Sequence, residues 1–172
     1  MRLDELPRRS WVDAEPRRVV AERDAMTAIA PELVWDEESP SGGWTGLAPV
    51  WPFDRQAPAT LAAFLDGRRL TVRVDYPQAF PLAEPIVRPL DPEPEWYTRT
   101  DHRWHVNGDG SLCLLQRAGD WTGQEHAAEL VRKASGWFLE FLLMQADVVE
   151  EMTEAGLAED DSRDGLLVPG AA

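Results

Sequence analysis

The chain has little cysteine and no long apolar run. Cys113 is its one cysteine in 172 residues, which excludes a disulfide framework and a zinc module built on several cysteines. No stretch approaches the roughly 20 apolar residues of a membrane-spanning helix, and the N-terminal residues lack the apolar core of a signal peptide. We therefore expect a cytoplasmic protein without a membrane partner.

Basic residues are also scarce. The chain has 31 Asp and Glu against 17 Lys and Arg, which gives a formal net charge of −14. A surface of this sign repels a phosphate backbone, so we expect no nucleic-acid partner. The shares of apolar residues (44%) and charged residues (28%) are ordinary for a globular protein, and the length suits one domain.

Two segments have helical periodicity. Residues 15–29 begin with a proline in the first turn, and residues 125–144 have a broad apolar face in which Gly136 costs about 1 kcal/mol without ending the helix. Residues 145–157 fit a further acidic helix. The apolar residues of the first segment fall on one side: Val19, Val20, Ala25, Met26 and Ile29.

The segments between these helices read as strands. Residues 69–75 alternate apolar and polar side chains and predict a half-buried antiparallel strand. Residues 33–38 and 44–53 are further strand candidates, and residues 86–90 fit an edge strand because their proline cannot donate to a ladder. The apolar positions of the alternating segment are Leu70, Val72 and Val74.

The order of these segments predicts the fold class. A helix, an antiparallel meander of about four strands and then helices, without alternation of strand and helix, indicate an α+β fold with the helices on one face of the sheet. We divide the chain into an N-terminal extension (1–14), one domain (15–157) and an acidic tail (158–172). The composition of the tail predicts disorder.

The single cysteine lies in the segment DHRWHVNGDGSLCLLQRAGDW, residues 101–121. The Asn-Gly pair at 107–108 and the Asp-Gly pair at 109–110 favour a tight loop that leads into a short apolar run carrying Cys113. A free cysteine between leucines is commonly a buried apolar filler. No basic side chain adjoins it in the sequence to activate the thiol.

Three chemical uses of Cys113 are open. A metal site would use His102, His105 and Cys113, which are only three ligands, so we predict no metal and no cofactor. A cysteine hydrolase would pair Cys113 with His105 or His126, but no hydrolase signature surrounds the cysteine. Acyl transfer through a thioester needs a thiol nucleophile and a donor such as Asn for the oxyanion.

Several short motifs follow one another between residues 76 and 121. They are Tyr76-Pro77, Phe80-Pro81, Glu84-Pro85-Ile86-Val87, His105-Val106-Asn107, Gly110-Ser111-Leu112-Cys113-Leu114 and Trp121. Over roughly residues 15–145, this order resembles the ubiquitin-conjugating enzyme family. That family has a "YP…P…V" segment after its third strand and a "His-Pro-Asn…Gly-x-Ile-Cys-Leu" segment around its active cysteine. Val106 replaces the family's proline, and the spacing from His105 to Cys113 is shorter than in the eukaryotic proteins.

The resemblance implies the ubiquitin-conjugating (UBC-like) fold and catalytic roles for three residues. Cys113 would form the thioester, and Asn107 would stabilise the oxyanion when an amine attacks. His105 matches the structural histidine of the family's tripeptide. The sequence is similar to a bacterial branch of the family, some members of which occur in antiphage operons.

Candidate substrate-binding residues flank the cysteine. Trp121 matches a tryptophan that packs beside the family's catalytic loop. Most of the eight tryptophans are expected to pack in the core or a groove, and Trp104 and Trp121 are the two expected to border a site. There they would line a channel for an extended C-terminal tail, with packing in the core as the alternative. Asp120 is a candidate for lowering the pKa of an incoming amine.

The resemblance implies an acyl carrier. Cys113 would accept the C-terminal carboxylate of a ubiquitin-like protein, or of another protein, by thioester exchange and pass it to an amine. Its partners would include an activating-enzyme-like protein or a cGAS-like nucleotidyltransferase, and its role would lie in bacterial antiviral defence. A non-catalytic binding module of the same fold and a cysteine hydrolase are the alternatives. Lys133 is the single lysine, which the codon usage of a GC-rich genome explains, although few amines would also spare a reactive thioester.

Overall fold

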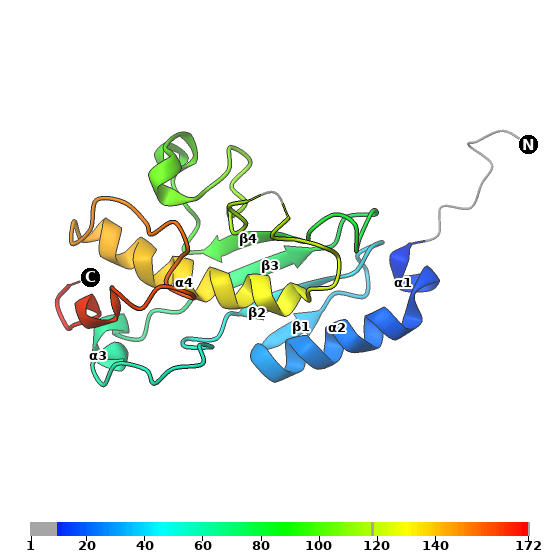
Figure 1. Ribbon diagram of the computed structural model, residues 1–172, viewed down its shortest axis with the longest axis horizontal. Helices are drawn as coiled ribbons and strands as arrows, with labels where there is room; N and C mark the ends of the chain where they lie inside the picture. The colour runs from blue at the N-terminus through cyan, green and yellow to red at the C-terminus, as the bar shows by residue number, and fades with distance from the viewer. Residues whose placement is uncertain (1–9, 118, 172) are drawn as a thin grey trace, which may run out of the picture.

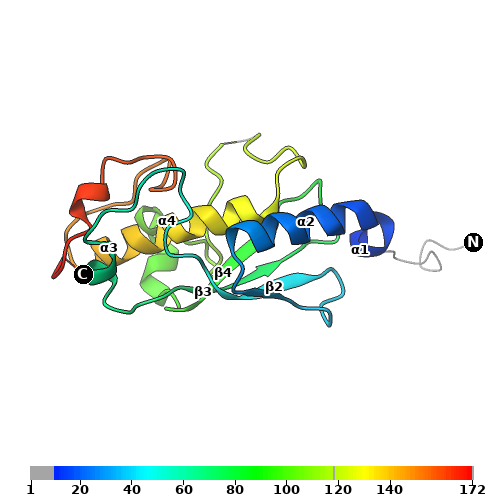
Figure 2. The same cartoon turned by 90° about the horizontal axis from the view of Figure 1, so that it is seen from below.

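One antiparallel sheet organises the protein. The computed structural model describes residues 10–117 and 119–171, and within them four strands pair in chain order. The predicted meander, with the last strand at an edge, is confirmed. Helices α2 and α4 lie together on one side of the sheet (Figure 1, Figure 2), so the architecture fits the α+β class. The main elements are α2 (Pro16–Ile29), β1 (Leu33–Trp35), β2 (Gly43–Leu47), β3 (Thr71–Asp75), β4 (Ile86–Asp91) and α4 (Ala127–Gln145).

Short helices complete the fold. They connect or flank the main elements, and none is longer than five residues. Two of them follow β4 and lead into the segment that carries Cys113. The short elements are α1 (Trp11–Ala14), α3 (Leu61–Leu65) and the 3-10 helices Trp96–Thr100, His102–Trp104 and Asp164–Leu166.

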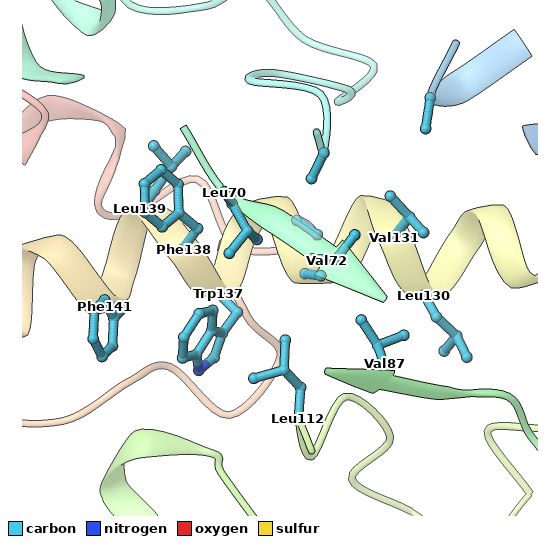
Figure 3. Close-up of a cluster of buried hydrophobic side chains, with 14 of the residues drawn as sticks. Leu70, Val72, Val87, Leu112, Leu130, Val131, Trp137, Phe138, Leu139 and Phe141 are labelled. Atoms are coloured by element: carbon cyan, nitrogen blue, oxygen red, sulfur yellow. The ribbon is translucent and has the colours of Figure 1, made fainter. Parts of the chain in front are cut away.

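The core lies between the sheet and α4. Val72 and Val74 of β3 are fully buried, as the alternation predicts, while Arg73 and Asp75 face the other side of the sheet. Figure 3 shows side chains of β3 and β4 meeting the apolar face of α4. Apolar side chains recur at every second residue of a strand and about every 3.6 residues of a helix, so each element has one apolar face. The burial of these faces against each other provides most of the stabilising energy.

A buried carboxylate joins α2 to α4. Glu22 has no exposed surface, and its oxygens accept hydrogen bonds from the Tyr76 hydroxyl at 2.8 Å and from the backbone N–H of Ala127 at 2.9 Å. His126 Nδ1 lies 2.8 Å from one oxygen, and Arg18 pairs with the same oxygen at 3.0 Å. These contacts compensate the cost of burying the charge.

This cluster corrects the predicted buried face of α2. Met26 is buried as expected, but Val20 is 59% exposed and Glu22 occupies the interior instead. The periodicity of one helix cannot reveal a buried carboxylate, because the groups that satisfy Glu22 belong largely to other segments.

The folded region begins before residue 15. Residues 1–9 of the predicted extension (1–14) lie outside the described residues, but Trp11 belongs to α1 and is 3% exposed. Its indole N–H donates to the carbonyl of Ser41 at 2.7 Å, and its ring centroid lies 4.6 Å from that of Phe80. The domain therefore includes at least part of this extension.

The predicted disorder of residues 158–172 is wrong for the part that the structure describes, up to residue 171. Leu167 is fully buried, and Arg55 donates two hydrogen bonds to Asp164, at 2.7 and 2.8 Å. The acidic composition of the segment predicted disorder. It could not show that an arginine from a distant part of the chain neutralises Asp164.

The predicted acidic helix over residues 145–157 does not form. Helix α4 ends at Gln145, and the following chain runs back along it without regular structure. Glu140, 1% exposed on α4, holds this returning chain by accepting hydrogen bonds from the N–H and the hydroxyl of Thr153 and from Arg163. Burial nevertheless raises the pKa of Glu140 above its usual 4.5.

Gly136 allows the returning chain to lie directly on α4. A Cβ at this position would lie 2.8 Å from the backbone nitrogen of Ala158, closer than packing allows. The glycine that weakens the helix in isolation is therefore required by a tertiary contact.

We expect Glu22→Gln to destabilise the protein by about 3 kcal/mol, because it removes the charge that faces Arg18 inside the protein. Chemical denaturation measures this loss. Asp24→Asn makes the same change in charge on the exposed side of α2 and should leave the free energy of unfolding within about 0.5 kcal/mol of the wild-type value. Equal effects of the two variants would contradict this account of Glu22.

We expect Gly136→Ala to lower the free energy of unfolding by about 1–3 kcal/mol, although alanine favours a free helix. The added methyl group must push the backbone of Ala158 away. Thermal unfolding checks this, with Gly165→Ala as control, because a Cβ at Gly165 meets nothing within 4 Å. A more stable Gly136→Ala variant would show that the contact is not required.

Candidate functional site

Cys113 follows a short loop that is anchored to the edge strand β4. Val106 and Leu112 form an antiparallel bridge, and the N–H of Cys113 donates to the carbonyl of His105 at 2.8 Å. The N–H of Leu112 donates to the carbonyl of Val87 at 2.9 Å. The backbone from Val106 to Cys113 is therefore closed on itself and attached to the sheet.

The extended backbone turns alternate side chains in opposite directions. Leu112 is 6% exposed and lies near Val87 and Trp137 (Figure 3), whereas Cys113 is only partly buried. Its sulfur contacts the carbonyl oxygen of Leu115 at 3.9 Å. The interpretation of Cys113 as a fully buried filler is therefore wrong.

A cavity of about 180 Å³ opens beside the thiol. Most of its lining residues have apolar side chains, and they come from β4 and the approach to it, the cysteine loop and α4. Cys113 and Asn107, two of the predicted catalytic residues, share this cavity. The full lining is Glu84, Pro85, Val87, Asn107, Leu112, Cys113, Leu114, Leu115 and Leu130.

A chain of side-chain hydrogen bonds holds Asn107. Its Nδ2 donates to Ser111 Oγ at 3.0 Å, and Ser111 Oγ donates to Asp109 Oδ1 at 2.6 Å. Arg88 of β4 donates to the other oxygen of Asp109 at 3.0 Å and also pairs with Asp75 of β3. Because an amide has two N–H groups and Ser111 takes one, Asn107 is positioned without losing its capacity as a donor.

His105 is placed beside Cys113 but does not bond to its sulfur. Its Nδ1 lies 3.2 Å from Nε2 of Gln116, and burial lowers its pKa below 6.5, which favours the neutral ring. His126, the other histidine considered for a hydrolase, is held by the buried carboxylate of α2. Among residues 10–117 and 119–171, neither histidine is hydrogen-bonded to the thiol of Cys113.

A metal centre and a membrane helix also lack a structural basis in the described residues. No three His, Cys, Asp or Glu side chains gather there as metal ligands would, so His102, His105 and Cys113 do not form such a site. No helix of this part of the chain has the length and apolar character needed to cross a bilayer.

A second cavity, of about 410 Å³, adjoins the first and shares three leucines with it. Asp120 and Trp121 both line it. The indole N–H of Trp121 donates to the carbonyl of Pro81 at 2.8 Å, which holds the loop after Cys113 in place. Asp120 accepts the N–H groups of Gln116 and Arg117, and these bonds lower its pKa below 3.8.

The structure does not bring Trp104 into either cavity, which corrects its predicted role in substrate binding. Trp104 is 8% exposed, and its ring packs against Phe141 of α4 with 5.6 Å between centroids. Its carbonyl accepts the indole N–H of Trp137 at 2.8 Å. Trp104 therefore supports the cysteine loop from the core.

The sequence indicated the tight loop but not the side-chain hydrogen bonds that hold it. Asp109 and Ser111 have the i to i+2 spacing of an Asx turn, which is a local signal that would have found them. Arg88 has no such signal, because its contact with Asp109 depends on strand pairing. Glu154 and Glu159, which line the larger cavity, lie in two segments predicted as an acidic helix (145–157) and as a disordered tail (158–172).

Comparisons with protein-family models, with curated proteins and with solved structures find no match for this chain. A functional interpretation therefore depends on the motifs around Cys113 and on the geometry that surrounds it. That geometry combines a partly exposed thiol, a positioned amide and two adjoining cavities.

The pKa of Asp109 lies below its usual 3.8 because Ser111 and Arg88 bind the carboxylate. A folded-state pKa below the unfolded value means that this interaction stabilises the loop fully above about pH 4 and is lost as the pH falls through the folded pKa. We expect the amide resonance of Ser111 to titrate with a midpoint below 3.8. Ser111→Ala should move the Asp109 carboxyl midpoint upward, and an unchanged midpoint would contradict these bonds.

Proposed function

We propose that this protein is a cysteine-dependent acyl carrier of the ubiquitin-conjugating type with a UBC-like fold. Cys113 accepts the C-terminal carboxylate of a ubiquitin-like or other protein as a thioester and passes it to an amine. The observation that carries the proposal is the position of Cys113, partly exposed at a cavity that it shares with Asn107. The order of motifs around the cysteine supports the same function.

The cavity beside Cys113 suits an extended acyl chain. Its leucines and Pro85 offer apolar contact along a donor tail, and Glu84 is its one acidic side chain. A tail laid there ends at the thiol, so the carboxyl group to be transferred lies next to the nucleophile. Positioning of this kind lowers the entropic part of the barrier.

The chemistry consists of two acyl transfers. The thiolate of Cys113 attacks the donor's thioester carbonyl, and the donor's own thiolate leaves. An amine then attacks the new thioester, and the carbonyl oxygen becomes an oxyanion that the amide of Asn107 stabilises. As the C–O double bond forms again, the C–S bond breaks, and the sulfur of Cys113 leaves and takes up the proton that the nitrogen loses. One donor of this kind contributes about 3 kcal/mol in characterised acyl transfers.

The geometry favours transfer over hydrolysis. A cysteine hydrolase needs a base that first activates the thiol and later activates the water molecule that hydrolyses the acyl-enzyme. Neither His105 nor His126 is hydrogen-bonded to Cys113 in the described ranges. A carrier does not need this base, because an incoming thioester is already reactive.

Incubation of the full chain with a synthetic peptide thioester that ends in glycine tests the proposal. We expect intact-mass spectrometry to detect one acyl adduct on Cys113 that dithiothreitol removes, and Cys113→Ala should acquire none. Asn107→Ala should load normally but release its acyl group to added lysine about 100-fold more slowly. A wild-type chain that stays unmodified and reacts slowly with iodoacetamide would favour a non-catalytic binding module.

A further inference from the structure

The only cysteine and the only lysine of the chain face the same narrow space. Lys133 lies on α4, and Lys133 and Cys113 are both lining residues of the gap between the cysteine loop, α4 and the returning C-terminal chain. His105, Gln116 and Glu154 border the same gap. Nothing in the sequence spacing of 113 and 133 requires this approach, which results from packing of the loop against α4.

Lys133 also lines the larger cavity of about 410 Å³. Its Nζ pairs with Glu159 at 3.0 Å, and its side chain is 22% exposed, so the ion pair holds a side chain that keeps part of its surface in solvent. Glu154 lines both the gap and the larger cavity and adds a second carboxylate near Lys133. The carboxylates attract an ammonium group and offer a base that removes its proton.

The arginine side chains of the chain do not compete for an acyl group. Of the 17 lysine and arginine residues, all except Lys133 are arginines. A guanidinium group keeps its proton at neutral pH, so it is not a nucleophile under conditions in which a lysine amine reacts. Lys133 is therefore the one side-chain amine that a thioester on Cys113 can meet within the same molecule.

We propose that Lys133 is the chain's own acyl acceptor, so that an acyl group carried by Cys113 moves to Lys133 when no external amine takes it. This inference rests on the proposed function of Cys113. It assigns Lys133 as a modification site and predicts that one chain retains at most one acyl group on a side-chain amine.

The transfer is balanced within the site. The ammonium group of Lys133 gives one proton to Glu159, and the neutral Nζ attacks the thioester carbonyl carbon. The new C–N bond forms, the C–S bond breaks, and the sulfur of Cys113 leaves with the electron pair. The second proton of the attacking nitrogen goes to this sulfur, which leaves an amide on Lys133 and a free thiol.

The peptide thioester described above tests the inference with the full chain. After loading and prolonged incubation, dithiothreitol should remove the Cys113 adduct but leave a second population that tandem mass spectrometry maps to Lys133. Lys133→Arg keeps the charge that pairs with Glu159, so it should load Cys113 normally while its resistant adduct falls about tenfold or more. Because the step is intramolecular, the resistant fraction of the wild-type chain should not change on tenfold dilution.

Two controls separate this inference from the proposed function. Cys113→Ala should acquire no adduct on Lys133, and an adduct there would show direct reaction with the peptide thioester and overturn the inference. If Cys113 loads normally but no resistant adduct appears, the inference is overturned and the proposed function stands. The same holds if the resistant adduct lies on the N-terminal amine and persists in Lys133→Arg. Failure to load Cys113 overturns both.

Discussion

Glu22 places a negative charge inside the protein, and one of the elements that satisfy it, α4, also lines the cavity beside the cysteine. Its partners come from α2, from Tyr76 after β3 and from the start of α4. Arg18, which pairs with Glu22, also donates to the carbonyls of Gly123 and Glu125 in the loop that leads from the cysteine to α4. A buried charge keeps its energy low only when every partner stays in place, so this cluster couples the approach of α2 and α4 to the end of the cysteine loop.

The other end of the loop is held by the sheet. Leu112 is inserted into the core beside β4, and the next residue, Cys113, necessarily points outward. On the outer face, alternating charges run from Arg73 through Asp75 and Arg88 to Asp109, where the chain of hydrogen bonds to Asn107 begins. The edge strand β4 thus positions both the thiol of Cys113 and the amide of Asn107, although these two residues lie on opposite sides of a turn.

Local signals in the sequence predicted much of this arrangement. The alternation around Val72 identified β3, and the motifs around Cys113 singled out Asn107, which shares its cavity. The prediction failed where a side chain is decided by distant partners. Trp104 lies near Cys113 in sequence but turns into the core, and the acidic segment after residue 157 is ordered by Arg55 and by the burial of Leu167. Composition describes average solubility and carries no information about such pairs.

The dependence of Glu140 on Arg163 has a consequence for where the domain can be cut. A polypeptide that stops at residue 157 would keep the carboxylate of Glu140 in the interior and lose its only arginine partner within the described residues. It would also uncover the surface of α4 next to Gly136, on which Ala158 lies. The smallest autonomous folding unit therefore extends beyond the last regular helix, and its C-terminal boundary is set by charge neutralisation.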